Sequence, residues 1–327
     1  MLRVVRIIGL ELALLILVYV VLALIPLTGQ RFYIYLGSLF MIYAIFALSY
    51  NVLFGYARLV SFGHGLFFAW GAYATALTTL NLYRDPLVGV LVGIVTALIP
   101  SLVVGFLTVR HTRIYFAILT LAFGMVFYSA LVKLRWLTGG TDGLVGIPKR
   151  GVILDISSPQ AYYYFILAFF IVSTLLLYAI SRSSIGLLIR ALGGNEERLP
   201  FLGYSVFQLR LVAFTISGVG SALAGSLYAI LMGVVTPDIS YWTFSAEPLI
   251  MCLVGGFEHF MGPLVGAFVI VVLTTIAARF YEVWMLVLGL MVIGIVLAFR
   301  GGFTGFLETT WNLARHMVVA RGGASKS

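Results

Sequence analysis

The side chains that most often carry out chemistry are few in this sequence and stand apart from one another. The one cysteine, Cys252, lies inside an apolar run, which excludes an internal disulfide and a metal site built from several thiolates. The phosphate-binding pattern G-x-x-x-x-G-K-[ST] is absent, because the tail sequence at 322–327 lacks the glycine before its lysine. The histidines are scattered singly, at His64, His111, His259 and His316. The sequence therefore predicts no catalytic residue, no metal site and no cofactor.

The composition is that of a chain dissolved in lipid. Hydrophobic residues make up 62% of the sequence, charged residues only 9%, and the mean hydropathy is +1.12. A soluble domain carries about a quarter charged residues, so most of this chain must lie in a lipid bilayer. The formal net charge is +9. Because the basic residues lie between apolar runs, they are typical of charges that hold loops in the cytoplasm, and no nucleic-acid partner is expected.

Ten apolar segments are candidates for crossing the membrane, where a helix needs about 20 residues. We therefore predict an all-α polytopic membrane protein, one transmembrane domain over 1–327, with about ten transmembrane or broken helices. The first segment follows Arg3 and Arg6 but has no small-x-small cleavage site after it, so it is interpreted as a span and not a signal peptide. The ten segments are Ile7–Leu27, Phe32–Phe54, Val60–Leu80, Leu87–Val109, Ile114–Lys133, Ala161–Ile180, Leu211–Leu231 and the shorter Phe244–Phe257, Pro263–Ala278 and Val283–Phe299.

The distribution of basic residues between the loops predicts the orientation. If all ten segments cross and the N-terminus is cytoplasmic, thirteen Lys and Arg lie in the cytoplasm and seven lie outside. This bias favours cytoplasmic N- and C-termini, with the tail 301–327 in the cytoplasm.

Two glycine clusters place polar groups inside apolar segments. The first contains Ser61, Gly63, His64 and Gly65, and the second begins at Gly255 and Gly256. Irregular backbone at membrane depth needs protein or a water-filled cavity to satisfy its polar groups. We expect these breaks to flank a translocation path, the alternative being helix ends at the interface.

Three further expectations attach to these clusters. For His64, which is close to Arg58 in the sequence, an interfacial structural role is favoured. Glu247 is the acidic residue expected to enter the second half of the bundle. The similarity of the two clusters would fit two inverted repeats of five helices each.

Two polar loops are long enough to do more than connect spans. The outer loop, 134–160, contains Thr138, Gly139, Gly140, Thr141 and Asp142. The inner loop, 182–209, is predicted to form a helix from Ile185 to Leu199 that Pro200 ends. Its spaced apolar residues could dock in a groove of a soluble partner, the alternative being a solvated connector. The residues concerned are Arg190, Leu192, Asn195, Glu196, Glu197 and Arg198.

Several stretches match one transporter family in order along the chain. They are residues 59–73, 115–124, 137–144, 146–148, 189–198, 202–204, 211–214, 223–229, 255–256 and 262–267. Together they resemble the membrane permease of branched-chain amino-acid ABC importers, in the second of the two homologous permease subunits that such systems use. The sequence departs from the family pattern at Gly193, Gly194 and Pro200, so the resemblance leaves the length of the inner helix open.

The resemblance implies a permease subunit that forms the path for branched-chain or related small amino acids, in a bacterial or archaeal cytoplasmic (inner) membrane. Its implied partners are a homologous second permease, two ATP-hydrolysing subunits and an extracytoplasmic solute-binding protein. The ATPases would act on Arg190–Arg198, and the binding protein would contact Thr138–Asp142. Two alternatives stay open. A related urea or short-amide permease is disfavoured by the 138–144 loop, and an ion-driven secondary transporter by the lack of a charged pair at mid-depth.

Overall fold

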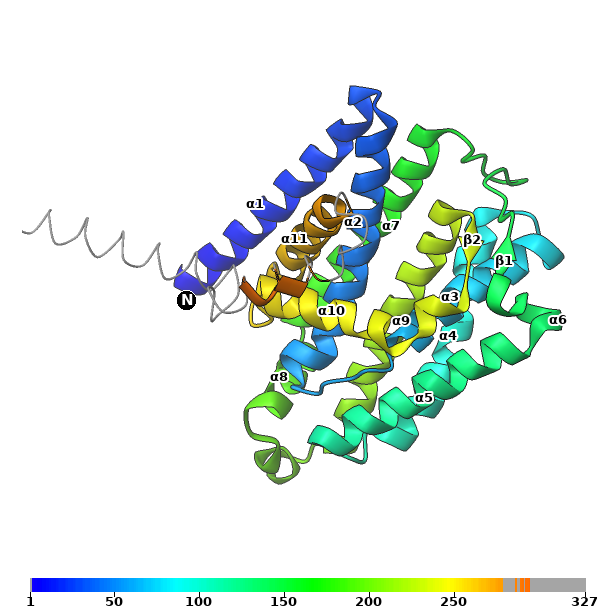
Figure 1. Ribbon diagram of the computed structural model, residues 1–327. Helices are drawn as coiled ribbons and strands as arrows, with labels where there is room; N and C mark the ends of the chain where they lie inside the picture. The colour runs from blue at the N-terminus through cyan, green and yellow to red at the C-terminus, as the bar shows by residue number, and fades with distance from the viewer. Residues whose placement is uncertain (1, 279–285, 287–288, 291, 295–327) are drawn as a thin grey trace, which may run out of the picture.

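The computed structural model describes residues 2–278, 286, 289–290 and 292–294 (Figure 1). Most of the predicted segment Val283–Phe299, and all of the predicted tail 301–327, lie outside these residues. The described part is almost entirely helical, as predicted. Its α-helices are α1 (Leu2–Leu24), α2 (Arg31–Asn51), α3 (His64–Leu77), α4 (Pro86–Thr108), α5 (Arg113–Lys133), α6 (Arg135–Thr138), α7 (Pro159–Arg182), α8 (Ser184–Asn195), α9 (Val206–Met232), α10 (Trp242–Gly255) and α11 (Gly262–Ala277).

Short turns and one small ladder complete the described chain. Strands β1 (Leu144–Val145) and β2 (Val234–Val235) pair antiparallel, with Leu144 opposite Val235. Two π-helical turns, at Val52–Tyr56 and Thr78–Leu82, extend α2 and α3. The 3₁₀ turns are Ile25–Thr28, Gly140–Asp142, Glu196–Arg198, Pro200–Leu202 and Pro237–Ser240.

Six of the described helical stretches are long and apolar enough to cross a bilayer alone. They are Glu11–Thr28, Arg31–Tyr56, Pro86–Thr108, Arg113–Lys133, Pro159–Arg182 and Val206–Met232. By contrast α3 and α10 have 14 residues each, and α11 has 16. At 1.5 Å per residue these helices are about 21–24 Å long, against about 30 Å of hydrocarbon. They are therefore shorter than the hydrocarbon layer, although the π turn Thr78–Leu82 extends α3, and a helix end inside that layer needs polar partners within the protein.

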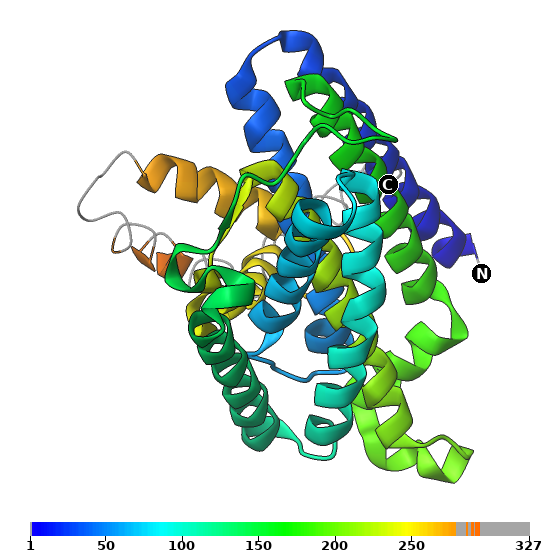
Figure 2. The same ribbon diagram turned by 90° about the vertical axis from the view of Figure 1, so that its right-hand side faces the viewer.

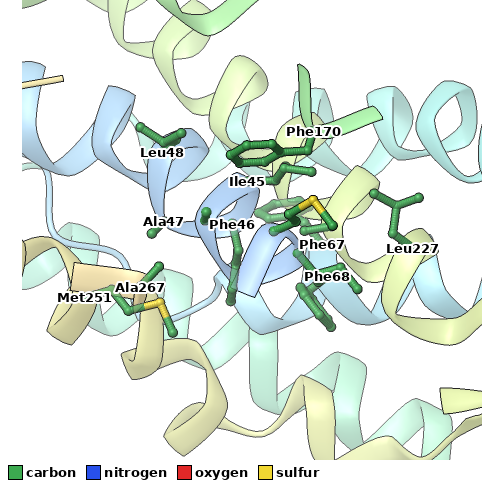
Figure 3. Packing of buried hydrophobic residues seen from close by; sticks show 14 of the residues in the cluster. Ile45, Phe46, Ala47, Leu48, Phe67, Phe68, Phe170, Leu227, Met251 and Ala267 are labelled. Atoms are coloured by element: carbon green, nitrogen blue, oxygen red, sulfur yellow. The ribbon is translucent and has the colours of Figure 1, made fainter. Parts of the chain in front are cut away.

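The long helix α9 is the centre of the bundle and packs on α2, α3 and α4, while α10 packs on α11 and α2 (Figures 1 and 2). Glycines allow α3 and α9 to approach closely. A Cβ at Gly71 would overlap the carbonyl of Ala222, and one at Gly225 would overlap the carbonyl of Phe68. Around this contact lies a core of large apolar side chains, including Phe46, Phe67 and Phe68 (Figure 3).

The loops gather at two opposite ends of the bundle. At the 134–160 end, the Asp85 carboxylate accepts from the amides of Ile153 and Leu154, and Lys149 donates to the carbonyl of Leu231. At the 182–209 end, Arg210 donates to the carbonyl of Val109 at the close of α4. The loops predicted to share one side of the membrane therefore do lie together.

Candidate functional site

The first glycine cluster forms a break in which a non-helical segment, 57–63, leads from the π turn after α2 into α3. The Tyr50 hydroxyl donates to the Ser61 carbonyl at 2.8 Å and accepts from the Ser61 amide at 3.1 Å. The Gly65 amide donates to Ser245 Oγ of α10 at 2.8 Å. The Phe62 amide likewise donates to Thr120 of α5. Neighbouring helices thus satisfy backbone groups that lipid could not.

His64 lies at the centre of this break, and the expectation of an interfacial position is wrong. Its side chain is completely buried, with Nδ1 2.8 Å from Ser61 Oγ and Nε2 2.7 Å from Ser217 Oγ. Ser217 is eleven residues into α9, or about 16 Å along that helix. The error came from sequence proximity to Arg58. The non-helical segment 58–63 carries the chain inward from Arg58, so closeness in the sequence does not keep His64 at the end of the bundle.

The second glycine cluster forms the turn 256–261 between α10 and α11. Gly256 has φ +99°, which side-chain-bearing residues rarely adopt. The turn meets the first break at the 182–209 end. Arg58 forms an ion pair of 3.1 Å with Glu258 and stacks over Phe257, and Asn51 donates to the Phe257 carbonyl. The two breaks therefore contact each other, although their residues are some 200 positions apart. That they flank a translocation path stays a prediction.

The inner loop forms a shorter helix than predicted. The helix α8 ends at Asn195 and not at Leu199, in keeping with the poor helix propensity of Gly193 and Gly194 just before its end. The Ser183 hydroxyl caps its start by accepting from the Gly186 amide at 3.3 Å. Two 3₁₀ turns follow, the second beginning at Pro200.

Three of the predicted partner-facing residues in this loop contact the chain itself. Leu192 is only 6% exposed and packs in the chain's own core, so it is not available as an anchor for a partner. Glu196 forms an ion pair with Arg210, whose guanidinium is buried and also donates to Val109. The guanidinium of Arg190 stacks over the Tyr56 ring at 4.3 Å. Asn195, Glu197 and Arg198 are exposed.

The apolar side chains that do face outward here are not those named as docking residues from the sequence, although Leu202 belongs to a stretch that carries the family resemblance. Phe201 is 90% exposed and Leu202 is 70% exposed, on the turn between Pro200 and Gly203. Leu187 on α8 is also exposed. The signal was present in the sequence, because a turn fixed by proline and glycine presents the two residues between them.

In the outer loop, the residues 138–142 divide into a packed part and an exposed part. Thr138 is buried and its hydroxyl donates to the Leu134 carbonyl at 2.9 Å. Gly139 and Gly140 both have positive φ, and Gly140 is buried. Thr141 and Asp142 are exposed. Contact with a binding protein stays a prediction, and these last two residues are the side chains that could make it.

Asp85 holds the outer loop to the start of α4 and was not anticipated from the sequence. It is fully buried and accepts from the amides of Leu87, Ile153 and Leu154. Burial would raise the pKa of this carboxyl, but the backbone N–H donors outweigh it, and the pKa lies below the ordinary value.

Glu247 enters the bundle from α10. The hydroxyl of Tyr43 on α2 lies within hydrogen-bonding reach of its carboxyl. Pairing of these two positions, 204 residues apart, could not be read from the sequence.

Comparison with known proteins gives two relatives that match most of the chain. It is 29% identical over 295 residues to the high-affinity branched-chain amino acid transport system permease protein LivM of Escherichia coli, and 30% identical over 293 residues to LivM of Salmonella typhimurium. Each match covers 81% of this chain and 68% of the relative.

A third relative matches over a shorter stretch, and the family model covers most of the chain. The ribose import permease protein RbsC of Haemophilus influenzae is 29% identical over 136 residues, which is 40% of this chain and 38% of that protein. No solved structure matches the chain. The model of the permease component of branched-chain amino acid transport systems matches residues 32–296. With six long apolar helices in the part that the structure describes, this chain belongs to that permease family.

Proposed function

We propose that this chain pairs with a second, homologous permease subunit to form a path for branched-chain amino acids across a bacterial or archaeal cytoplasmic membrane. Two separate ATPase subunits drive the cycle from the 182–209 end, which faces the cytoplasm. A solute-binding protein delivers the amino acid at the 134–160 end. The choice of solute rests on the LivM relatives, whose names state branched-chain amino acid transport.

The observation that carries this proposal is the link between an exposed apolar turn and the central helix. Phe201 and Leu202 stand out from the protein on the Pro200–Leu202 turn. Four residues after Leu202, α9 begins, and its Arg210 ties it to Glu196 and to the end of α4. A partner that grips Phe201 would therefore move α9 and the helices packed on it. This supports driving by a docked subunit, and it disfavours an ion-driven transporter.

Transport itself is tested with the complete complex. The two permeases and two ATPases are reconstituted in vesicles, and uptake of radiolabelled leucine is measured with the binding protein and ATP. We expect accumulation that requires both. Ribose and urea serve as alternative solutes. Accumulation of either one in place of leucine, or leucine uptake driven by an ion gradient without ATP, would refute the proposal.

The docking residue is tested by Phe201→Asp. Truncating a well-packed aromatic anchor typically costs about 2 kcal/mol, or about a 30-fold loss of affinity. We expect the variant to lose ATPase subunits during purification and to lose uptake. The matched control is Trp136→Asp, which changes an aromatic residue of similar exposure, 82%, at the opposite end. Full retention of ATPase by Phe201→Asp, with normal uptake, would place the docking contact elsewhere.

A further inference from the structure

Glu247 carries a carboxyl group that the described protein satisfies only in part. Tyr43 of α2 lies beside the carboxyl. The atom Oε2 is enclosed, yet no described residue donates a hydrogen bond to it. No Lys, Arg or His among the described residues forms an ion pair with Glu247. Carboxylates inside a membrane protein are costly without a partner and usually mark function.

Aromatic rings from four helices frame this carboxyl. Phe244 lies three residues before Glu247 on α10, hence on the same side of the helix. Its ring centroid is 6.4 Å from that of Tyr43 and 4.8 Å from that of Phe68. Tyr228 of α9 packs on Phe68, with the ring centroids 5.4 Å apart. Figure 3 shows Phe68 beside Phe46. The buried ring of Phe46 stacks on Phe244, with the centroids 5.9 Å apart.

The group is not fully enclosed. Phe46 and Phe68 are completely buried, whereas Tyr43, Tyr228, Phe244 and Glu247 are all partly exposed. Tyr35 extends the same wall toward the 134–160 end. It is 39% exposed, and its hydroxyl contacts the sulfur of Met232 at the end of α9. A solute arriving at that end would therefore meet tyrosine hydroxyls first and the carboxyl deeper.

The chemistry of the group fits a primary ammonium. Such a cation has three N–H donors, and Glu247 Oε2 and the Tyr43 oxygen offer two acceptors. The faces of Tyr and Phe rings attract cations within about 6 Å. A Ca²⁺ or Mg²⁺ ion would need about six oxygen ligands, which one carboxylate and the tyrosine hydroxyls do not supply. We propose that Glu247, framed by Tyr43, Tyr228 and Phe244, binds the α-ammonium group of the transported amino acid. This inference rests on the proposed function.

Ligand-induced thermal stabilisation of the purified permease–ATPase complex, without binding protein, tests the ammonium requirement. The probes are leucine, leucinamide, which keeps the ammonium, and 4-methylpentanoate, which lacks it, each at millimolar concentration. We expect the first two to stabilise the wild type and the third to have no effect. Glu247→Gln should weaken both ammonium ligands at least tenfold, and Glu247→Asp should do so less. The control Glu258→Gln changes an exposed acid and should bind as the wild type does.

The outcomes separate this site from the function on which it depends. Stabilisation by 4-methylpentanoate equal to that by leucine, no stabilisation by either ammonium ligand, or unchanged binding by Glu247→Gln would each overturn the ammonium site. Unfolding temperatures measured without ligand show whether Glu247→Gln has lost stability. If it has, ligand binding by Glu247→Asp is compared with that of the wild type instead. If the wild type accumulates leucine and Glu247→Gln does so with unchanged KM and rate, only this inference fails. If the wild type does not accumulate leucine, the proposed function fails.

Discussion

The two ends of the molecule are held together by different kinds of polar contact. At the 134–160 end, backbone amides of Ile153 and Leu154 converge on one buried carboxylate, Asp85, and a short ladder joins β1 to β2. At the 182–209 end, ion pairs between long side chains join separate elements. These pairs are Arg210–Glu196, Arg58–Glu258 and Arg182–Glu11.

The difference has a physical consequence for movement. A main-chain amide bound to a buried carboxylate has no other partner nearby, so opening that contact costs its full desolvation. Arginine side chains are long, and a guanidinium can exchange one acceptor for another as helices shift. We therefore expect the 134–160 end to be the fixed end of this chain. The 182–209 end is suited to receive motion and to change its pairing.

The largest effect should follow from opening the buried ion pair at the 182–209 end. Glu196→Ala leaves the Arg210 guanidinium, whose side chain is 8% exposed, with the Val109 carbonyl alone. Breaking a buried pair costs about 3–5 kcal/mol. Because Glu196 is 45% exposed, we expect about 2–3 kcal/mol here. The thermal unfolding of the detergent-solubilised complex measures it.

Glu197 supplies the matched control for this substitution. It is the next residue and also acidic, but it is exposed and belongs to none of the described ion pairs. Glu197→Ala should unfold at the wild-type temperature. Equal unfolding temperatures for the two variants would mean that Arg210 finds another acceptor. The buried pair would then contribute no measurable stability.

A somewhat smaller effect is expected at the opposite end from Asp85→Asn. The amide would place a donor against backbone donors, since both carboxylate oxygens now accept. An unsatisfied buried group costs about 1–3 kcal/mol. Hydrogen exchange at the amides of Ile153 and Leu154 should accelerate. Asp155 is an exposed acid in the same loop, and Asp155→Asn should leave the exchange of these amides nearly unchanged. Acceleration in both variants would show that Asp85 does not anchor the loop specifically.

The same contact predicts a pH dependence confined to the 134–160 end. The pKa of Asp85 is lower in the folded protein than in the unfolded chain, so its stabilisation is complete above the ordinary carboxyl pKa. It is lost as pH falls below about 4, toward the lowered value. The protection of the Ile153 and Leu154 amides, corrected for the intrinsic pH dependence of exchange, should therefore decrease below about pH 4, and in Asp85→Asn this decrease should be absent.

How far the sequence predicts this fold depends on the length of each apolar run. Runs such as 87–109 became α4 within two residues, because apolar length alone decides that a helix spans. The predicted span Val60–Leu80 became the shorter α3, because hydrogen bonds to the Tyr50 hydroxyl hold Ser61 outside the helix. The helix α9 begins five residues before the predicted Leu211. Ser205 caps it, and Arg210 is tolerated inside because Glu196 pairs with it.

The candidate sites were harder to predict, because side-chain partners come from distant positions. The sequence indicated that the 182–209 loop carries charge and apolar residues. It could not indicate that Leu192 packs inward while Phe201 stands out, since helical spacing allows either face to be buried. Nor does it show that Glu247 meets Tyr43, since that pairing depends on how α10 crosses α2.

The smallest effect is expected from the exposed pair between the two helix breaks. Arg58 and Glu258 have side chains that are 46% and 68% exposed, and such pairs contribute about 0.2–1 kcal/mol. In Glu258→Gln, Arg58 keeps its position 4.7 Å over the Phe257 ring, which limits the loss further. We expect a small decrease in unfolding temperature that disappears at high salt, since exposed charges are screened. A decrease as large as that of Glu196→Ala, at any salt concentration, would show that the two breaks are joined as firmly as α9 is joined to the inner loop. The 182–209 end would then have no weak ion pair to distinguish it from the 134–160 end.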